Sequence, residues 1–370
     1  MQIISRALTC ALLAGSALAL SPAAEAQSFR DKFRGGAMGA RDMQAGPMMG
    51  GQRGIGGFSE RRRPGTSGGG AMLGGGGQGH FPGVQKARPP EGAVEVSIEV
   101  DGHARSFYLY KPRGFRHEGS AVLGLHGGGG TAAHLMAKAS LPQHAAEHGF
   151  LAVFPDGIDG NWNDGRAQFK DRPDDLAFMR GLVDWLVANE GIDRGRVFAT
   201  GSSNGGAMSH KLACEAPDLV AGITTISANL HDALHAACRP TESTPVLMIS
   251  GTEDPLMLYN GGTPDIPGRE SHGVVLSAPA TAEFWAGVAG CAPSPTVRDL
   301  PDRVEDGTTV TAITYRCPGD QIILLRVNGG GHGVPGGEPA RGFKARLTGP
   351  TSQEIDAFAL AISFFSKSIP

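Results

Sequence analysis

One serine in this sequence lies where a nucleophile is expected. Residues 201–205 read Gly-Ser-Ser-Asn-Gly, which is the Gly-x-Ser-x-Gly spacing around Ser203. A largely apolar run at 196–200 precedes it and a helical stretch at 206–213 follows, so the pattern predicts a strand, a sharp turn and a helix. Glycine is favoured beside such a crowded turn because it has no Cβ. A serine hydroxyl is a weak nucleophile, and Ser203 therefore needs a base and an acid that orients the base.

Two later residues could supply this base and acid. Asp254 and His332 each follow an apolar run that is typical of a buried strand. The chain order Ser, Asp, His is that of α/β hydrolases, and ligands of open α/β sheets lie beyond the carboxyl ends of the strands. His332 would take the proton of Ser203 and return it to a leaving alcohol, while Asp254 would fix the imidazole tautomer. Glu253 is the competing acid, but the Gly-x-x-Asp spacing from Gly251 favours Asp254.

A glycine-rich run could stabilise the oxyanion that forms when a serine attacks a carbonyl. Residues 125–130 read Leu-His-Gly-Gly-Gly-Gly and follow an early apolar run, as in many esterases. We expect the backbone N–H groups of Gly128 and Asn204 to be the two donors, although the pattern leaves open which glycine donates. A phosphate-binding loop would end in Lys followed by Ser or Thr, whereas 131–133 read Thr-Ala-Ala.

The elements that must position these residues alternate along the chain. Short apolar runs separated by helical stretches predict a doubly wound α/β domain with a mostly parallel central sheet flanked by helices. Together with the Ser, Asp, His order, this indicates the α/β-hydrolase fold. An alternating pattern at 94–110, interrupted by Asp101-Gly102, predicts an antiparallel hairpin at the N-terminal edge. The other predicted strands are 121–126, 150–154, 197–200, 220–226, 246–250 and 322–327, and the predicted helices are 137–148, 176–189, 280–288 and 352–365.

The chain divides by composition into three parts. Residues 1–26 have the basic start, apolar run and small-residue end of a secretory signal peptide, which predicts cleavage before Gln27 and a secreted or periplasmic protein. The apolar run is too short for a membrane span. Residues 27–91 are rich in Gly, Met and Arg without apolar periodicity, so we expect a disordered segment. Residues 92–370 form the predicted catalytic domain.

The net charge and the cysteine content indicate which ligands the chain is expected to bind and how its fold is cross-linked. The formal net charge of −3 gives no reason to expect nucleic acid binding. Four cysteines follow the signal segment, and an even number in an exported chain indicates disulfides. Three pairings are possible, and we favour the sequential one, in which each bridge closes a loop of about 25 residues and stabilises the fold by roughly 3 kcal/mol. Free buried thiols are the alternative, and no ligand spacing indicates a metal. The favoured pairs are Cys214 with Cys238 and Cys291 with Cys317.

Trp162 and Arg166 lie in a loop near the predicted active face. In one interpretation they bind substrate, the ring by stacking and the guanidinium by contacting a carboxylate or a sugar. In the other, the ring packs and Arg166 forms an ion pair with Asp164 or Asp175. Asp174 and Asp175 are expected to cap the following helix.

Taken together, these motifs resemble the secreted polyhydroxybutyrate depolymerase and feruloyl esterase group of α/β hydrolases, which includes acetylxylan-type esterases. The resemblance extends over about 92–370 and includes the cysteine positions. It implies a serine esterase without a cofactor that acts on hydroxyalkanoate esters or on ester substituents of plant polysaccharides. One departure is that Gly333-Val334-Pro335 stands where the group often has Trp-Pro, which predicts a reshaped acyl pocket. The matching segments are 125–130, 162–166, 174–178, 201–206, 251–255, 259–262 and 330–337.

The sequence therefore predicts a monomeric, secreted serine carboxylic-ester hydrolase whose partner is a hydroxyalkanoate oligomer or an acylated polysaccharide fragment. Two alternatives stay open. A peptidase of the same fold would use the same three residues, usually with an additional gating domain. A non-catalytic extracellular binding protein would not need Ser, Asp and His in this order.

Overall fold

The structure is a computed structural model that describes residues 88–115, 119–264 and 273–369. The predicted signal peptide 1–26 and all but the last residues of the predicted disordered segment 27–91 lie outside the described residues. The chain divides into two units, 1–77 and 78–370, and every element below belongs to the second. Among the described residues, no helix is long and apolar enough to cross a membrane.

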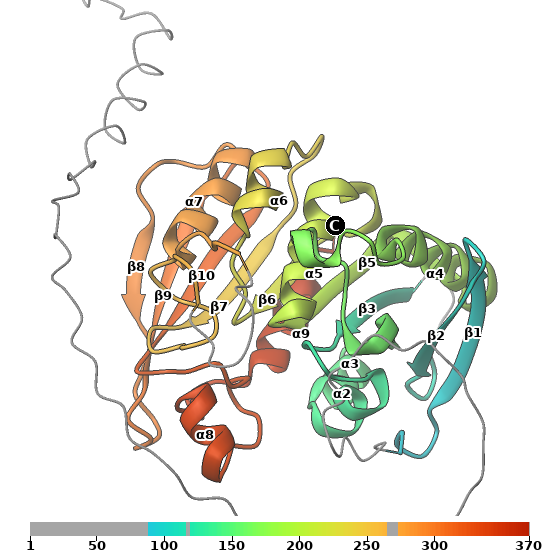
Figure 1. Cartoon of the computed structure of the whole chain (residues 1–370), viewed down its shortest axis with the longest axis horizontal. Helices are drawn as coiled ribbons and strands as arrows, with labels where there is room; N and C mark the ends of the chain where they lie inside the picture. The colour runs from blue at the N-terminus through green and yellow to red at the C-terminus, as the bar shows by residue number, and fades with distance from the viewer. Residues whose placement is uncertain (1–87, 116–118, 265–272, 370) are drawn as a thin grey trace, which may run out of the picture. The chain divides into compact units, whose positions relative to one another are not determined.

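The described strands form one ten-stranded sheet in the order β1-β2-β4-β3-β5-β6-β7-β10-β9-β8 (Figure 1). The six central strands, from β4 to β10, pair in parallel, as predicted. The strands are β1 (Val94–Val100), β2 (His103–Tyr110), β3 (Gly119–Leu125), β4 (Phe150–Pro155), β5 (Ile192–Ser202), β6 (Ile223–Ile226), β7 (Val246–Gly251), β8 (Thr296–Asp299), β9 (Thr309–Arg316) and β10 (Gln321–Asn328).

Both edges of the sheet are antiparallel. The predicted N-terminal hairpin is β1–β2, and its turn is Asp101-Gly102, where both residues have positive φ (50° and 75°). Two positive φ values match the twist of a two-residue hairpin, and Asp-Gly tolerates them well. The opposite edge, β8–β9, was not predicted from the sequence. All four residues of β8 are exposed, so this strand lacks the apolar run that marks a buried one.

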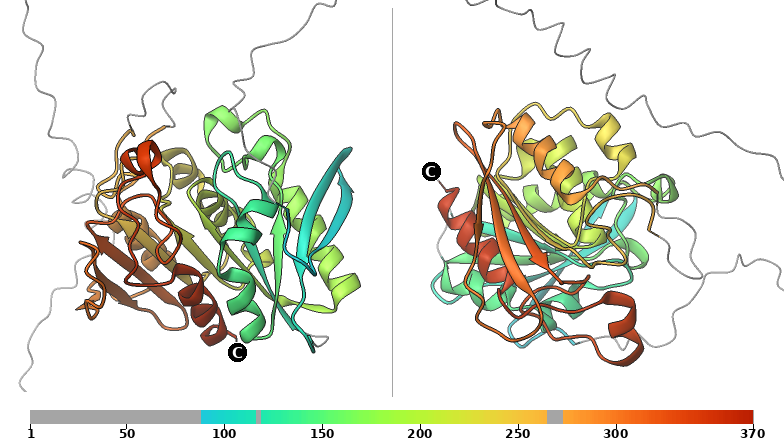
Figure 2. Two further views of the ribbon diagram at one scale, coloured as in Figure 1. Left: turned by 90° about the horizontal axis from the view of Figure 1, so that it is seen from below. Right: turned by 90° about the vertical axis from the view of Figure 1, so that its left-hand side faces the viewer.

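Helices cover both faces of the sheet (Figure 2). Helices α4, α5 and α7 pack on one apolar core, and α2, α3 and α9 pack on the other. This double layer places the core on either side of the parallel strands. The helices are α2 (Ala132–Lys138), α3 (Leu141–Glu147), α4 (Asp175–Glu190), α5 (Asn204–Glu215), α6 (Asp232–Ala237), α7 (Ala278–Val288), α8 (Gly342–Thr348) and α9 (Ala357–Lys367), with the 3₁₀ turns η1 (Ile158–Gly160), η2 (Ala167–Phe169) and η3 (Pro217–Leu219).

Two predicted helix boundaries are corrected. The single helix expected at 137–148 is two short helices, α2 and α3, and Pro142 lies in the first turn of the second. Proline has no backbone N–H and therefore favours a new helix start over a continuous helix. The last helix begins at Ala357 rather than 352, because the Asp356 carboxylate accepts the N–H groups of Phe358 and Ala359 as its N-cap.

The predicted disulfide pairing is confirmed. Cys214 near the end of α5 is bonded to Cys238 after α6, and Cys291 after α7 is bonded to Cys317 after β9. The first bridge therefore joins α5 to the segment after α6, and the second joins the segment after α7 to the end of strand β9.

Candidate active site

Ser203 occupies the sharp turn between β5 and α5, with φ 55° and ψ −120°. A positive φ is uncommon for a residue with a side chain, and such strain is found at functional sites. The flanking glycines permit it, since a Cβ at Gly205 would lie 2.3 Å from the Leu125 carbonyl oxygen and one at Gly201 would lie 2.5 Å from the Gly205 backbone. The turn thus packs directly against the end of β3, and only glycine fits at positions 201 and 205.

The imidazole of His332 is held by Asp254. Nδ1 of His332 lies 2.8 Å from Oδ2 and 3.0 Å from Oδ1 of this carboxylate. The Asp254 side chain is 1% exposed, and its Oδ1 also accepts the N–H groups of Leu256 and Met257, each at 2.8 Å. A carboxylate only accepts hydrogen bonds, so Nδ1 carries the proton and Nε2 is left as a base. Glu253 is exposed and does not make this bond.

The sheet places Ser203, Asp254 and His332 together at the carboxyl ends of its central strands. Strands β5, β6, β7 and β10 are neighbours and parallel, so their carboxyl ends lie side by side. Backbone hydrogen bonds continue past these ends, from Ser203 N–H to the Ile226 carbonyl and from Thr252 N–H to the Val327 carbonyl. Within the described residues, the Ser203 hydroxyl and His332 do not form a hydrogen bond. Such bonds are often long in ligand-free enzymes and shorten when substrate binds.

The glycine-rich loop after β3 faces the same turn. The N–H of Gly129 donates to the Gly160 carbonyl at 2.7 Å, and the N–H of Gly130 donates to the Gly127 carbonyl at 3.0 Å. A Cβ at Gly128 would lie 3.6 Å from Cβ of Asn204, so these two residues are neighbours. In the part of the chain that the structure describes, the backbone N–H groups of Gly128 and Asn204 donate no hydrogen bond. They are therefore available to an oxyanion.

His126 fixes the position of this loop. Its Nε2 accepts the N–H of Gly157 at 2.9 Å, so Nδ1 carries the proton and donates to the Gly127 carbonyl at 2.9 Å. Burial lowers the pKa of His126, with opposing contributions from the Gly127 carbonyl and from the nearby carboxylate of Asp156. The ring is thus neutral at neutral pH, as both of its hydrogen bonds require.

The polar groups of Trp162 and Arg166 bond to other groups of the protein. Trp162 is fully buried, and its indole N–H donates to the His126 carbonyl at 2.9 Å. Of the two interpretations of Trp162, the structure therefore favours packing over stacking on substrate, because the ring has no exposed face. The Arg166 guanidinium contacts the buried carboxylate of Asp164 at 2.6–2.9 Å, as the ion-pair interpretation expected.

Both Asp174 and Asp175 were predicted to cap a helix, but in the structure only Asp174 does so. Asp174 is the N-cap of α4 and accepts the N–H of Leu176 at 2.8 Å, as predicted. Asp175 is buried and pairs with Arg105 at 2.5 Å. Sequence reasoning missed this pair because Arg105 lies on β2, 70 residues away.

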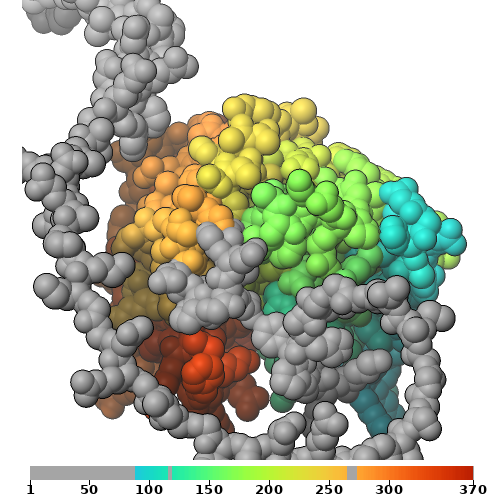
Figure 3. All heavy atoms as spheres, viewed as in Figure 1, coloured from blue at the N-terminus to red at the C-terminus, as the bar shows by residue number. Residues whose placement is uncertain are grey.

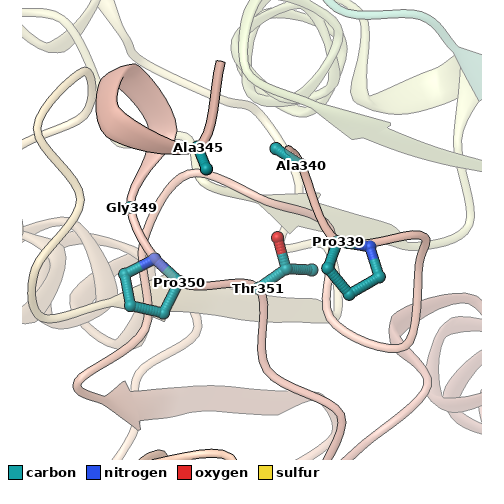
Figure 4. Close-up of a pocket in the computed structure, with 6 residues that line it drawn as sticks. All are labelled: Pro339, Ala340, Ala345, Gly349, Pro350 and Thr351. Carbon is teal, nitrogen blue, oxygen red and sulfur yellow. The ribbon is translucent and has the colours of Figure 1, made fainter. Parts of the chain in front are cut away.

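A cavity of about 310 Å³ adjoins the His332 loop, since its lining residues Pro350 and Thr351 lie against Gly331 and Gly333. Figure 4 shows the residues that line it. His332 N–H donates to the Thr348 carbonyl at 2.6 Å, so the loop is bonded to the end of α8. Helix α8 has no buried residue and lies at the surface (Figure 3). A Cβ at Gly333 would lie 2.1 Å from Oγ1 of Thr351, so Thr351 fills the space that a larger residue at 333 would need. The cavity is lined by Pro339, Ala340, Ala345, Gly349, Pro350 and Thr351.

The described residues do not form a metal site. Among the described residues, no group of three or more His, Cys, Asp or Glu side chains has the geometry of a metal site. The groups that the site does bring together are the serine, the histidine and the backbone donors.

Comparisons with known proteins point to the same chemistry, although no protein-family model matches the sequence. NocK of Nocardia uniformis subsp. tsuyamanensis, whose name assigns it as an esterase, is 30% identical over 293 residues, which cover 75% of this chain and 84% of NocK. Feruloyl esterase B of Piromyces equi is 26% identical over 248 residues. The alignment covers 65% of this chain but only 44% of that protein. A protein of Aspergillus terreus assigned as acetylxylan esterase A is 26% identical over 67% of this chain and 86% of its own length.

Among solved structures, an acetyl xylan esterase from Aspergillus awamori aligns with 69% of this chain and 98% of its own, with a TM-score of 0.47 and 16% identity. Fold and site together define an α/β hydrolase with a serine at the nucleophile position. The chain belongs to the same family of α/β-hydrolase esterases as NocK. It is a carboxylic ester hydrolase.

Proposed function

We propose that this protein is a secreted, monomeric esterase that cleaves esters through an acyl-enzyme on Ser203, with His332 as the base and Asp254 as its orienting acid. The observation that carries the proposal is the bond of 2.8 Å between His332 and the buried Asp254 carboxylate. This bond lies at the carboxyl ends of the central strands, where the Ser203 turn also lies. That bond leaves Nε2 of His332 free to take a proton.

The reaction follows from these positions. His332 removes the Ser203 proton as the hydroxyl attacks the ester carbonyl, and the N–H groups of Gly128 and Asn204 stabilise the resulting oxyanion. His332 then gives the proton to the leaving alcohol. Water, deprotonated by His332, attacks the acyl-enzyme and releases the acid. Each N–H donor is expected to stabilise the transition state by roughly 3 kcal/mol.

The substrate class that we propose is an ester substituent of a plant polysaccharide, because relatives that match this chain are named feruloyl esterase and acetylxylan esterase. Hydroxyalkanoate oligomers are the second candidate, on the resemblance of the motifs. Two disulfides in the described domain support export, since such bonds persist in oxidising compartments. We propose 92–370 as the catalytic domain, preceded by the signal peptide 1–26 and the segment 27–91.

The test is a substrate panel on the purified exported protein: p-nitrophenyl acetate and butyrate, methyl ferulate, acetylated xylan and hydroxybutyrate oligomers. We expect turnover of methyl ferulate or acetylated xylan, and loss of all turnover in Ser203→Ala with an unchanged melting temperature. Wild-type rates in Ser203→Ala would contradict the mechanism. Turnover of hydroxybutyrate oligomers alone would replace the proposed substrate by the second candidate.

A further inference from the structure

The side chain of Asn204 contacts a distant segment of the chain. Its Oδ1 accepts the N–H of Trp162 at 2.7 Å, and its Nδ2 donates to the Trp162 carbonyl at 3.1 Å and to Oδ2 of Asp164 at 2.7 Å. Asn204 and Asp164 are both buried, at 4% and 0% exposure. Asn204 supplies a candidate oxyanion donor through its backbone N–H. Its side chain is fixed by hydrogen bonds to residues 162–164.

Asp164 and the backbone of Trp162 together fix which way the Asn204 amide points. A carboxylate accepts hydrogen bonds and cannot donate them, so only Nδ2 of Asn204 can face it. That orientation leaves Oδ1 to accept the Trp162 N–H. Asp164 itself is held by Arg166, whose Nε and Nη2 lie 2.9 and 2.6 Å from its Oδ2. The buried charge is thereby paired, as a buried carboxylate requires.

The same segment also holds the other half of the candidate oxyanion hole. The Trp162 indole donates to the His126 carbonyl, and the Gly160 carbonyl accepts the N–H of Gly129. The Gly157 N–H donates to the His126 ring. Residues 157–164 therefore bond to the segments on both sides, the glycine loop and the start of α5, and they set the separation between the two donors.

We propose that Asp164, held by Arg166, is a positioning residue that sets the geometry of the oxyanion hole through the side chain of Asn204. This inference rests on the proposed function and assigns Asp164 a role at a distance from substrate. Removing a donor outright costs roughly 100- to 1,000-fold in kcat, and misplacing one costs less. Since the hole acts on the transition state, kcat falls while KM changes little.

The test compares Asp164→Asn and Asn204→Ala with wild type on p-nitrophenyl acetate. The rates are normalised to active sites titrated with a p-nitrophenyl phosphonate, so that only folded, reactive molecules are counted. We expect kcat per active site to fall about 10- to 30-fold with KM within about threefold. Affinity for a trifluoromethyl ketone, which forms a tetrahedral adduct, should fall in parallel. The acid limb of the pH profile should not move, because His332 and Asp254 are untouched.

A double-mutant cycle separates positioning from general destabilisation. If Asp164 acts through Asn204, Asp164→Asn in the Asn204→Ala background should lower kcat by no more than about twofold further. Arg166→Lys keeps the charge but not the two-point contact, and it should give an intermediate kcat if the Asn variant is too unstable to assay. Asp218→Asn is the control, since Asp218 also pairs with one arginine, Arg180, at 2.7 and 3.1 Å, but is exposed.

Two results would overturn the proposal: a kcat per titrated site within about twofold of wild type in Asp164→Asn, or losses that simply multiply in the double variant. Either result would leave the proposed function intact as long as Ser203→Ala is inactive. Activity in Ser203→Ala would instead refute the proposed mechanism itself.

Discussion

At the scale of single residues, the Asp254 carboxylate is surrounded by donors. Two backbone N–H groups and Nδ1 of His332 all bond to it, and its side chain is 1% exposed. An amide in its place would have to turn an N–H₂ group toward at least one of these donors. We therefore expect Asp254→Asn to favour the wrong tautomer of His332 and to lower kcat by roughly 1,000- to 10,000-fold, measured on p-nitrophenyl acetate.

Glu253→Gln is the matched control for that prediction. The Glu253 side chain is exposed and lies next to Asp254 in the chain, so the substitution changes charge without touching His332. We expect its kcat to stay within about threefold of wild type. The assignment of the acid would be wrong if the two variants lost activity equally.

At the scale of elements, the turn between β5 and α5 depends on close backbone contacts. A Cβ at Gly205 would lie 2.3 Å from the Leu125 carbonyl oxygen and 2.6 Å from that of His126, and neither backbone atom can move without displacing the glycine loop. We expect Gly205→Ala to lower the free energy of unfolding by about 3 kcal/mol or more, measured by urea denaturation.

Gly287→Ala provides the contrast. Gly287 lies in α7 without a positive φ, and a Cβ added there would meet no neighbouring atom within 4 Å. Alanine there should be neutral or stabilise by up to about 1 kcal/mol, because glycine is a poor helix residue. Equal effects of the two substitutions would show that backbone crowding does not hold the turn.

Some of the elements could be predicted from the sequence and others could not. Buried parallel strands were predicted because each is a compact apolar run, and the Asp101-Gly102 turn identified the edge hairpin. The exposed edge strand β8 has no such pattern, and its existence depends on pairing with β9. In the same way, motif spacing singled out Ser203, but the bond from Asn204 to Asp164 joins residues 40 apart and follows only from the packed loops.

At the scale of the whole molecule, the two disulfides connect elements that lie around the central strands: α5 with the segment after α6, and the segment after α7 with the end of β9. Each spans 24 or 26 residues in sequence, so each restricts the unfolded chain by a similar amount. We expect Cys291→Ser with Cys317→Ser to lower the free energy of unfolding by roughly 3 kcal/mol, measured in urea without reductant. The variant and the wild type should converge when dithiothreitol reduces the bridges. A difference that persisted in reductant would assign the loss to packing instead.

The pH dependence of stability should carry the signature of a buried histidine. His210 is fully buried, its Nδ1 accepts the indole N–H of Trp285 at 3.1 Å, and its Nε2 faces the Ala228 carbonyl at 3.3 Å. Burial lowers the pKa of His210 to about 4, from an ordinary value of 6.5. As the pH falls below 6.5 the unfolded chain gains a proton at this position, whereas the folded protein gains it only near pH 4. The stabilisation from neutral His210 is therefore complete above pH 6.5 and is lost between 6.5 and 4, by about 3 kcal/mol.

His210→Gln isolates this contribution, because glutamine offers an acceptor to Trp285 and a donor to Ala228 but does not titrate. His126, whose pKa is also lowered by burial, and the carboxylates titrate in both proteins, so they cancel in the comparison. Between pH 7 and pH 4 we expect the wild type to lose about 3 kcal/mol more unfolding free energy than the variant, measured by urea denaturation at each pH. Parallel pH curves would mean that His210 takes up its proton over the same pH range in the folded and the unfolded chain. The hydrogen bond that its ring accepts from Trp285 would then have to break above pH 4.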